Sequence, residues 1–182
     1  MQHLATCCST NNLSLNTEKT KEVIVNYRKT KGCTNSPVHI NGTEVERVFS
    51  FKLLSVHISE DLSWTLNTSY LVKKVYQRLY LLRRIRKDHL SPQILTNFYC
   101  CTIESVLTNC VTVWYSGSNV ADRKALQKVV KNAQRTIGAH LPAIGDIHHQ
   151  HCVHRAHSII RDSFHLNHTH TTILEEIQEH PC

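Results

Sequence analysis

The chain has 182 residues, a formal net charge of +7 and a pI near 9.1. The length suits one domain or slightly more. The excess of positive charge favours a polyanionic partner such as nucleic acid. No apolar run approaches the roughly 18 residues of a membrane span, and the N-terminus lacks the basic head of a signal peptide. We therefore expect an intracellular protein without a membrane segment, in which the eight cysteines are reduced thiols.

The first third of the chain carries the pattern of β-strands. Residues 22–27 are a β-branched run, and Asn41-Gly42 separates two alternating arms, which is a strong signal for a β-hairpin. Residues 49–58 are typical of a further strand. Two or three strands without a covering helix leave an apolar face that needs a partner, so this unit is too small to close a sheet alone.

From about residue 66 the apolar residues recur at three- and four-residue steps, which predicts a helix. Its apolar stripe consists of Val72, Val75, Leu79, Leu82 and Ile85. Ser91 followed by Pro92 is an N-cap with a proline in the first turn, and it opens a second helix that continues to Trp114. Residues 116–119 then break the helical pattern.

The next helix has the clearest division into two faces. One face is apolar and comprises Leu126, Val129, Val130, Ala133 and Ile137. The opposite face is basic and comprises Lys124, Lys128, Lys131 and Arg135. Gly138 is the expected C-cap, and a last helix is predicted from Asp146 to about Arg161. The tail after Asp162 is rich in His and Thr and has no apolar period.

Strands first and helices afterwards predict an α+β protein. We expect a small antiparallel strand unit in residues 1–65, a bundle of three or four helices in residues 66–161, and a polar tail in residues 162–182. Because the strand unit lacks neighbours, the chain is interpreted as a piece of a longer protein.

Several motifs resemble LINE-type reverse transcriptases of non-LTR retrotransposons, in matching order and spacing. Residues 11–22 resemble the segment N-x-L-x-L-N-x-x-K-T-K, which in that family follows the catalytic Y-A-D-D box of the palm. Residues 49–64 are similar to the primer-grip motif F-K-F-L-G-V-x-I…D-L-x-W. Residues 78–84 and 103–107, with Trp114, are similar to the thumb. The resemblance covers residues 3–165 and implies a primer-grip hairpin followed by a helical thumb.

The departures from that family concern its catalytic residues. The family's catalytic aspartates would all lie upstream of the first residue of this chain. Polymerase chemistry needs two divalent metals held by carboxylates, but the adjacent pairs Glu60-Asp61 and Glu175-Glu176 fall in a turn and in a polar tail. Ser55 replaces the glycine of the primer grip and adds a Cβ where the backbone would pass close to the primer. We therefore expect no enzyme activity from this chain.

The same stretch also resembles the region classed as the N-terminal domain of AlkB homologue 8, a tRNA-modifying protein. That resemblance implies a methyltransferase or an iron- and 2-oxoglutarate-dependent oxygenase. The oxygenase needs the facial triad His-x-Asp/Glu with a distant His, yet none of the 14 carboxylates has a histidine two positions before it. Five scattered glycines form no Gly-rich turn for a methyltransferase. We expect neither activity and no cofactor.

Two groups of basic residues are candidates for contact with a phosphate backbone. The first is the basic helix face, Lys124, Lys128, Lys131 and Arg135. The second lies on the preceding long helix, away from its apolar stripe, and comprises Lys73, Lys74 and Arg84. A solvated helix face is the ordinary explanation for both, whereas the thumb resemblance favours phosphate contact. Aromatic residues are sparse among these cations, so backbone binding is favoured over base reading.

The last predicted helix is rich in histidine. His148, His151 and Cys152 share one face of it, at a spacing that a zinc ion could use. The reverse-transcriptase family has no ligand pattern at this place, and further histidines continue into the tail. Drift in an unselected copy explains the cluster better, so we expect no metal site.

Together, the residues and the resemblance predict a non-catalytic fragment of a retrotransposon reverse transcriptase, whose inherited role is primer–template contact. Nucleic acid is the expected partner, and the fingers and the rest of the palm would belong to a longer polymerase. One alternative is a nucleic-acid-binding or interaction module kept by the host, and another is a translated relic without function. Salt-dependent binding of RNA or DNA would favour the module over the relic.

Overall fold

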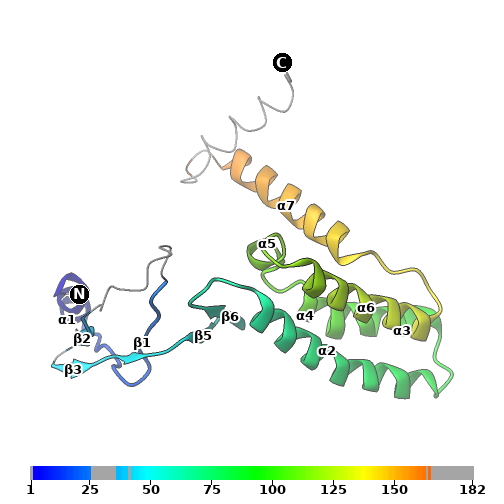
Figure 1. Ribbon diagram of the computed structural model, residues 1–182. Coiled ribbons are helices and arrows are strands. Elements are labelled where there is room, and N and C mark those ends of the chain that lie inside the picture. The colour runs from blue at the N-terminus through cyan, green and yellow to red at the C-terminus, as the bar shows by residue number, and fades with distance from the viewer. Residues whose placement is uncertain (1, 26–35, 41, 163, 165–182) are drawn as a thin grey trace. The chain divides into compact units, whose positions relative to one another are not determined.

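The computed structural model describes residues 2–25, 36–40, 42–162 and 164, and it divides into two compact units, Met1–Asn67 and Thr68–Cys182. The first unit holds a short helix and paired strands, and the second holds helices (Figure 1). The α+β class predicted from the order of elements is confirmed. Among the described residues, no helix combines the length and the apolar character that a bilayer span requires. The predicted polar tail lies almost wholly outside the described residues.

Helix α1, Gln2–Thr10, opens the first unit and is absent from the sequence prediction. It is followed by Asn12, whose backbone takes a left-handed φ of 53°. The backbone N–H of Leu13 donates to the Cys8 carbonyl at 2.8 Å, and that of Asn12 donates to the Ser9 carbonyl at 3.2 Å. These two bonds form a Schellman-type helix end, and asparagine tolerates the left-handed region better than most residues.

The first strand pair is parallel. β1, Lys21–Glu22, lies beside β4, Glu46–Arg47. Lys21 forms an ion pair with Glu46 directly opposite it, and Arg47 Nε lies 2.9 Å from Glu22 Oε2. Opposite charges at facing positions favour this register. The parallel direction of this pair differs from the antiparallel strand unit predicted from the sequence. Of the strand predicted over residues 22–27, only the first residue is in a strand, and the last two lie outside the described residues.

The second strand pair is the predicted hairpin. β2, His39–Ile40, pairs antiparallel with β3, Thr43–Glu44. Gly42 has a φ of 79° in the connecting turn, where glycine adopts the left-handed region without a Cβ penalty. The Asn-Gly signal is therefore confirmed.

The third strand pair corrects the prediction of one continuous strand over residues 49–58. β5, Ser50–Leu53, turns back into β6, Val56–Ser59, and the two pair antiparallel. Leu54 and Ser55 form the turn with φ values of 46° and 74°. Two successive positive φ values are typical of a type I′ hairpin turn, which usually contains Asn or Gly. Because neither residue type is present, the turn is invisible to pattern analysis.

The first long helix, α2, spans Thr65–Arg86. Its buried stripe comprises Leu71, Val75, Leu79 and Leu82. The predicted positions Val72 and Ile85 are only half-buried, so the stripe begins one residue earlier than expected. Four buried apolar side chains at helical spacing explain why this helix packs stably.

The helix predicted from residue 92 to residue 114 is interrupted. The structure divides it into α3 (Pro92–Tyr99), a π-helical turn (Cys100–Glu104), α4 (Ser105–Leu107) and α5 (Val111–Trp114). Ser91 caps α3 by accepting from the Ile94 backbone N–H at 3.5 Å. The Arg78 guanidinium donates to the Thr102 carbonyl within the π-turn. Cys110 has a left-handed φ of 51° and starts a new helix direction.

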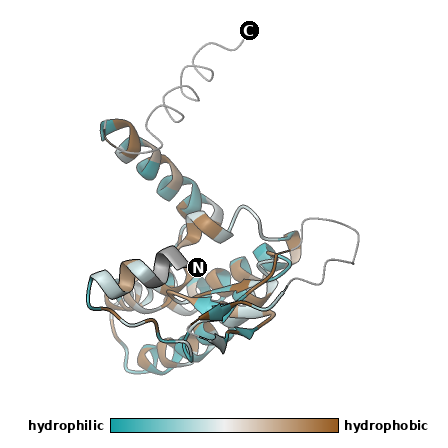
Figure 2. Cartoon of the chain, turned by 90° about the vertical axis from the view of Figure 1, so that its left-hand side faces the viewer, coloured by the Kyte–Doolittle hydropathy of each residue, from teal (hydrophilic) through white to brown (hydrophobic). Residues whose placement is uncertain are grey.

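The two last helices are α6, Val120–Ile137, and α7, Ile144–Arg161. The predicted apolar face of α6 is buried, and Gly138, with a φ of 81°, is its C-cap as predicted. The Gln127 side chain accepts from the first backbone N–H of α7 at 3.1 Å. Of α7, only Ile144 and Ile147 are buried, and hydrophobic and hydrophilic residues are mixed along the helix (Figure 2).

Candidate nucleic-acid interface

The basic face of α6 is formed as the sequence predicts. Its four cations, Lys124, Lys128, Lys131 and Arg135, are all exposed. At 3.6 residues per turn they fall within an arc of about 60°, and they extend along about 16 Å of helix axis. The apolar residues of α6 occupy the buried side, so the helix can present these four charges to a ligand without unfolding.

A shallow groove of about 370 Å³ follows this face. Its lining consists of Lys124, Gln127, Lys128, Lys131, Asn132 and Arg135. No carboxylate lines it, and among the described residues none of its four cations forms an ion pair. Asp122 is the acidic residue of the first turn of α6, but it is buried and lies away from the groove. The face therefore carries four positive charges without a compensating negative charge in its lining.

Arg86 adds a fifth cation, which sequence patterns did not indicate. It is the last residue of α2, and its Nη1 atom donates to the Arg135 carbonyl at 3.1 Å. This carbonyl belongs to the last turn of α6, where cations are favoured by the helix dipole. The bond joins the C-terminal ends of α2 and α6 and places a guanidinium at the end of the basic face.

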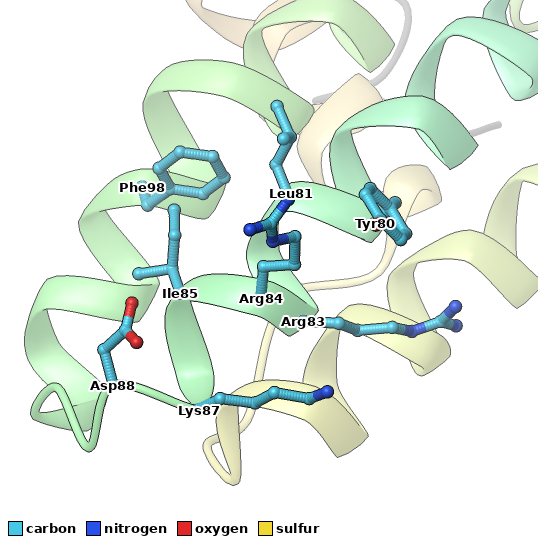
Figure 3. A pocket seen from close by; sticks show the side chains of 8 residues that line it. All are labelled: Tyr80, Leu81, Arg83, Arg84, Ile85, Lys87, Asp88 and Phe98. Atoms are coloured by element: carbon cyan, nitrogen blue, oxygen red, sulfur yellow. The ribbon is translucent and has the colours of Figure 1, made fainter.

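The second predicted group is not brought together in one cluster. Lys73 and Arg84 are exposed, whereas Lys74 is half-buried. Lys73 and Arg84 lie eleven residues apart on α2, which corresponds to about 16 Å along its axis. Arg84 instead lines a separate groove at the C-terminal end of α2 (Figure 3).

Other cations of this unit hold the fold together. Arg123 donates to the Ser116 carbonyl at 2.5 Å, and its guanidinium lies 5.2 Å from the centre of the Tyr115 ring. Arg155 Nη1 lies 3.4 Å from Thr112 Oγ1. These guanidinium groups already have partners, so the cations of α6 are the stronger candidates for phosphate contact.

The structure does not bring His148, His151 and Cys152 together in the way that their sequence spacing would allow for a zinc ion. His148 Nε2 lies 3.4 Å from Cys152 Sγ, and the His148 ring lies 4.9 Å from the Tyr115 ring. Burial lowers the pKa of His148, and Arg123 and neighbouring histidines lower it further. Burial raises the pKa of Glu104, and the positive charge of the exposed His151 offsets only part of this rise. Across residues 2–25, 36–40, 42–162 and 164, no three His, Cys, Asp or Glu residues converge as a metal site would require.

Part of the chain matches a known protein family. The family model described as alkylated DNA repair protein alkB homolog 8, N-terminal, matches residues 64–105. This stretch contains α2, α3 and the π-helical turn, and it supports the AlkB-homologue resemblance rather than the reverse-transcriptase one. No curated protein matches the chain, and no solved structure matches it. The match covers less than half of the chain, so the similarity is confined to the first part of the helical unit.

Proposed function

We propose that the helical unit is a non-catalytic module that binds the phosphate backbone of nucleic acids through the basic face of α6. The observation that carries this proposal is the row of four exposed cations along an open groove whose lining holds no carboxylate. Lys and Arg side chains in such a row neutralise phosphates and release their counterions, which drives binding without regard to sequence.

The dimensions of the face suit a duplex. Each strand of a DNA duplex carries one phosphate per about 3.4 Å of the axis, so 16 Å of α6 can face roughly five phosphates of one strand. Four cations within an arc of about 60° can reach phosphates of one backbone at the same time. Gln127 and Asn132 line the same groove and offer amide groups to sugar and phosphate oxygens.

The family match is consistent with this role. The family is named for the N-terminal region of a DNA repair protein homologue, and the matched stretch includes Arg86, which bonds to the end of α6. We propose no oxygenase step, because no carboxylate of the chain has a histidine two positions before it, and no methyltransferase step, because the five scattered glycines form no Gly-rich turn. The matched stretch is instead the scaffold against which α6 packs.

A second candidate function is contact with a primer–template duplex, as the resemblance to LINE-type reverse transcriptases implies. The observation that favours it is the β5–β6 hairpin, which falls on the residues that resemble the primer grip and precedes the helices. The two candidates differ in their preferred ligand. Tighter binding of an RNA–DNA hybrid than of a DNA duplex of equal length would favour the second candidate.

The test is fluorescence anisotropy of the full chain with a labelled 20-base-pair DNA duplex and the matching RNA–DNA hybrid, over a series of salt concentrations. Four phosphate contacts predict a slope of about −3.6 for log affinity against log salt. Equal affinity for duplexes of unrelated sequence is also expected, because phosphate contacts carry no base information. No binding at low salt, or a slope near zero, would overturn the proposal.

A further inference from the structure

A second groove lies where the C-terminal half of α2 meets α3. It has a volume of about 740 Å³, and its apolar lining comes from Tyr80, Leu81, Ile85 and Phe98 (Figure 3). Tyr80 is 59% exposed and Leu81 is 49% exposed, so the groove leaves apolar surface open to solvent. The exposure of an aromatic ring beside other apolar side chains marks a surface suited to a flat, partly apolar ligand.

The same groove is positively charged. Arg83, Arg84 and Lys87 line it with a single carboxylate, Asp88. Among the described residues, none of these four side chains forms an ion pair. A ligand that carries negative charge next to an apolar, flat part would therefore satisfy both halves of the groove.

The groove and the basic face of α6 have separate linings with no residue in common. Arg86, which bonds to the Arg135 carbonyl at the end of α6, does not line the groove. An exposed Tyr80 ring in the same lining as three cations favours a nucleotide over an acidic peptide, because a nucleotide joins a flat aromatic base to a phosphate.

We infer that the groove between α2 and α3 binds an unpaired nucleotide of a single-stranded nucleic acid. The base lies against the Tyr80 ring and the apolar lining, and the flanking phosphates meet Arg83, Arg84 and Lys87. Stacking on an aromatic ring with cations nearby is the general way in which proteins hold single strands without reading their sequence. The inference rests on the proposed function, which makes nucleic acid the partner, and it extends the ligand class from duplex to single strand.

The test uses the full chain and three probes of matched length: a labelled 12-nucleotide single strand, the same strand with abasic sites, and a 12-base-pair duplex. The wild type should bind the base-containing strand roughly 5- to 150-fold more tightly than the abasic strand, the range for one stacked base. Tyr80→Leu should abolish this preference, whereas Tyr80→Phe keeps a ring and should preserve it. Tyr76→Leu is the matched control, because Tyr76 is a partly exposed ring on the same helix outside the groove lining.

The outcomes separate this inference from the proposed function. If the wild type binds the duplex but does not distinguish base-containing from abasic strands, the groove inference fails and the proposed function stands. The groove inference also fails, with the proposed function intact, if Tyr80→Leu keeps the preference for bases. If an acidic amphipathic peptide binds in a Tyr80-dependent way while single strands bind independently of their bases, the groove is a peptide site. If the wild type binds none of the three nucleic acids, both proposals fail.

Discussion

Replacing Lys124, Lys128, Lys131 and Arg135 with glutamine removes the positive charge of α6 and little else. All four side chains are exposed, and the buried face of the helix is untouched. The bond from Arg86 is also kept, because it ends on the Arg135 backbone carbonyl and not on the side chain. The quadruple variant should therefore fold normally and differ only in its charge.

The expected effect can be calculated from the number of contacts. Each neutralised phosphate contributes about −0.9 to the slope of log affinity against log salt. Four contacts on the wild type correspond to about 3.6 units, so the variant should flatten the slope by roughly two to four units. Between 50 and 200 mM salt, four contacts would reduce wild-type affinity by about two orders of magnitude, a reduction largely absent in the variant.

The assay is anisotropy on a DNA duplex, with circular dichroism to confirm that helicity persists. A matched pair of double variants separates the effect of where a charge lies from the effect of the net charge. Lys128→Gln with Lys131→Gln should flatten the slope by about 1.8 units, at 0.9 per contact. Lys19→Gln with Arg161→Gln lowers the net charge equally but changes exposed residues outside α6, so it should leave the slope nearly unchanged. Equal slopes for the quadruple variant and the wild type would refute the reasoning and identify the face as merely solvated.

Three further predictions concern stability. Gly138→Ala forces a Cβ into the left-handed conformation at the end of α6 and should cost about 1 kcal/mol in urea unfolding. Trp114→Ala removes a fully buried ring and should cost about 3–5 kcal/mol, whereas Val113→Ala, at a position that is 55% exposed, should stay within about 0.5 kcal/mol of the wild type. Burial lowers the pKa of His148 below 6.5, so the folded state binds fewer protons than the unfolded state between the lowered pKa and 6.5. The free energy of unfolding is therefore highest above pH 6.5 and falls as the pH drops through the lowered pKa. His148→Gln should make unfolding less sensitive to pH below 6.5, and an unchanged pH profile would contradict this assignment.

The helices were largely predictable because their periodicity is strong and their ends carry specific residues. The basic face of α6 follows from helical geometry alone, since positions 124, 128, 131 and 135 share one side of any regular helix. Gly138 is the C-cap for a reason visible in the sequence, because glycine accepts the left-handed conformation at no steric cost. Helical spacing and capping preferences were therefore enough to predict the basic face and the C-cap of α6.

Apart from α1 and the parallel β1–β4 pair, the errors occurred where the backbone departs from regular geometry without a residue that signals it. Leu54 and Ser55 adopt positive φ values although neither is Gly or Asn, so the β5–β6 turn resembled a continuous strand. The π-turn at residues 100–104 and the left-handed Cys110 interrupt a helix whose apolar spacing is unbroken. In these cases the tertiary environment overrides local preference.

The second groove could not be predicted, because its residues come from two helices. Tyr80 lies on α2 and Phe98 on α3, and their proximity depends on how those helices pack. The role of Arg86 is likewise a tertiary contact with the carbonyl of Arg135. Sequence spacing finds residues that share one helix face, but it does not find residues that two helices bring together.

The central claim, that α6 meets the phosphate backbone, is tested most directly by nuclear magnetic resonance. The uniformly ¹⁵N-labelled chain is titrated with a DNA duplex, and the shifts of backbone amides and Lys Nζ groups are followed. Phosphate contact at α6 predicts the largest changes at Lys124, Lys128, Lys131 and Arg135, with reversal when salt is raised. Changes concentrated on α7, or none on α6 at a duplex concentration that saturates binding, would contradict it.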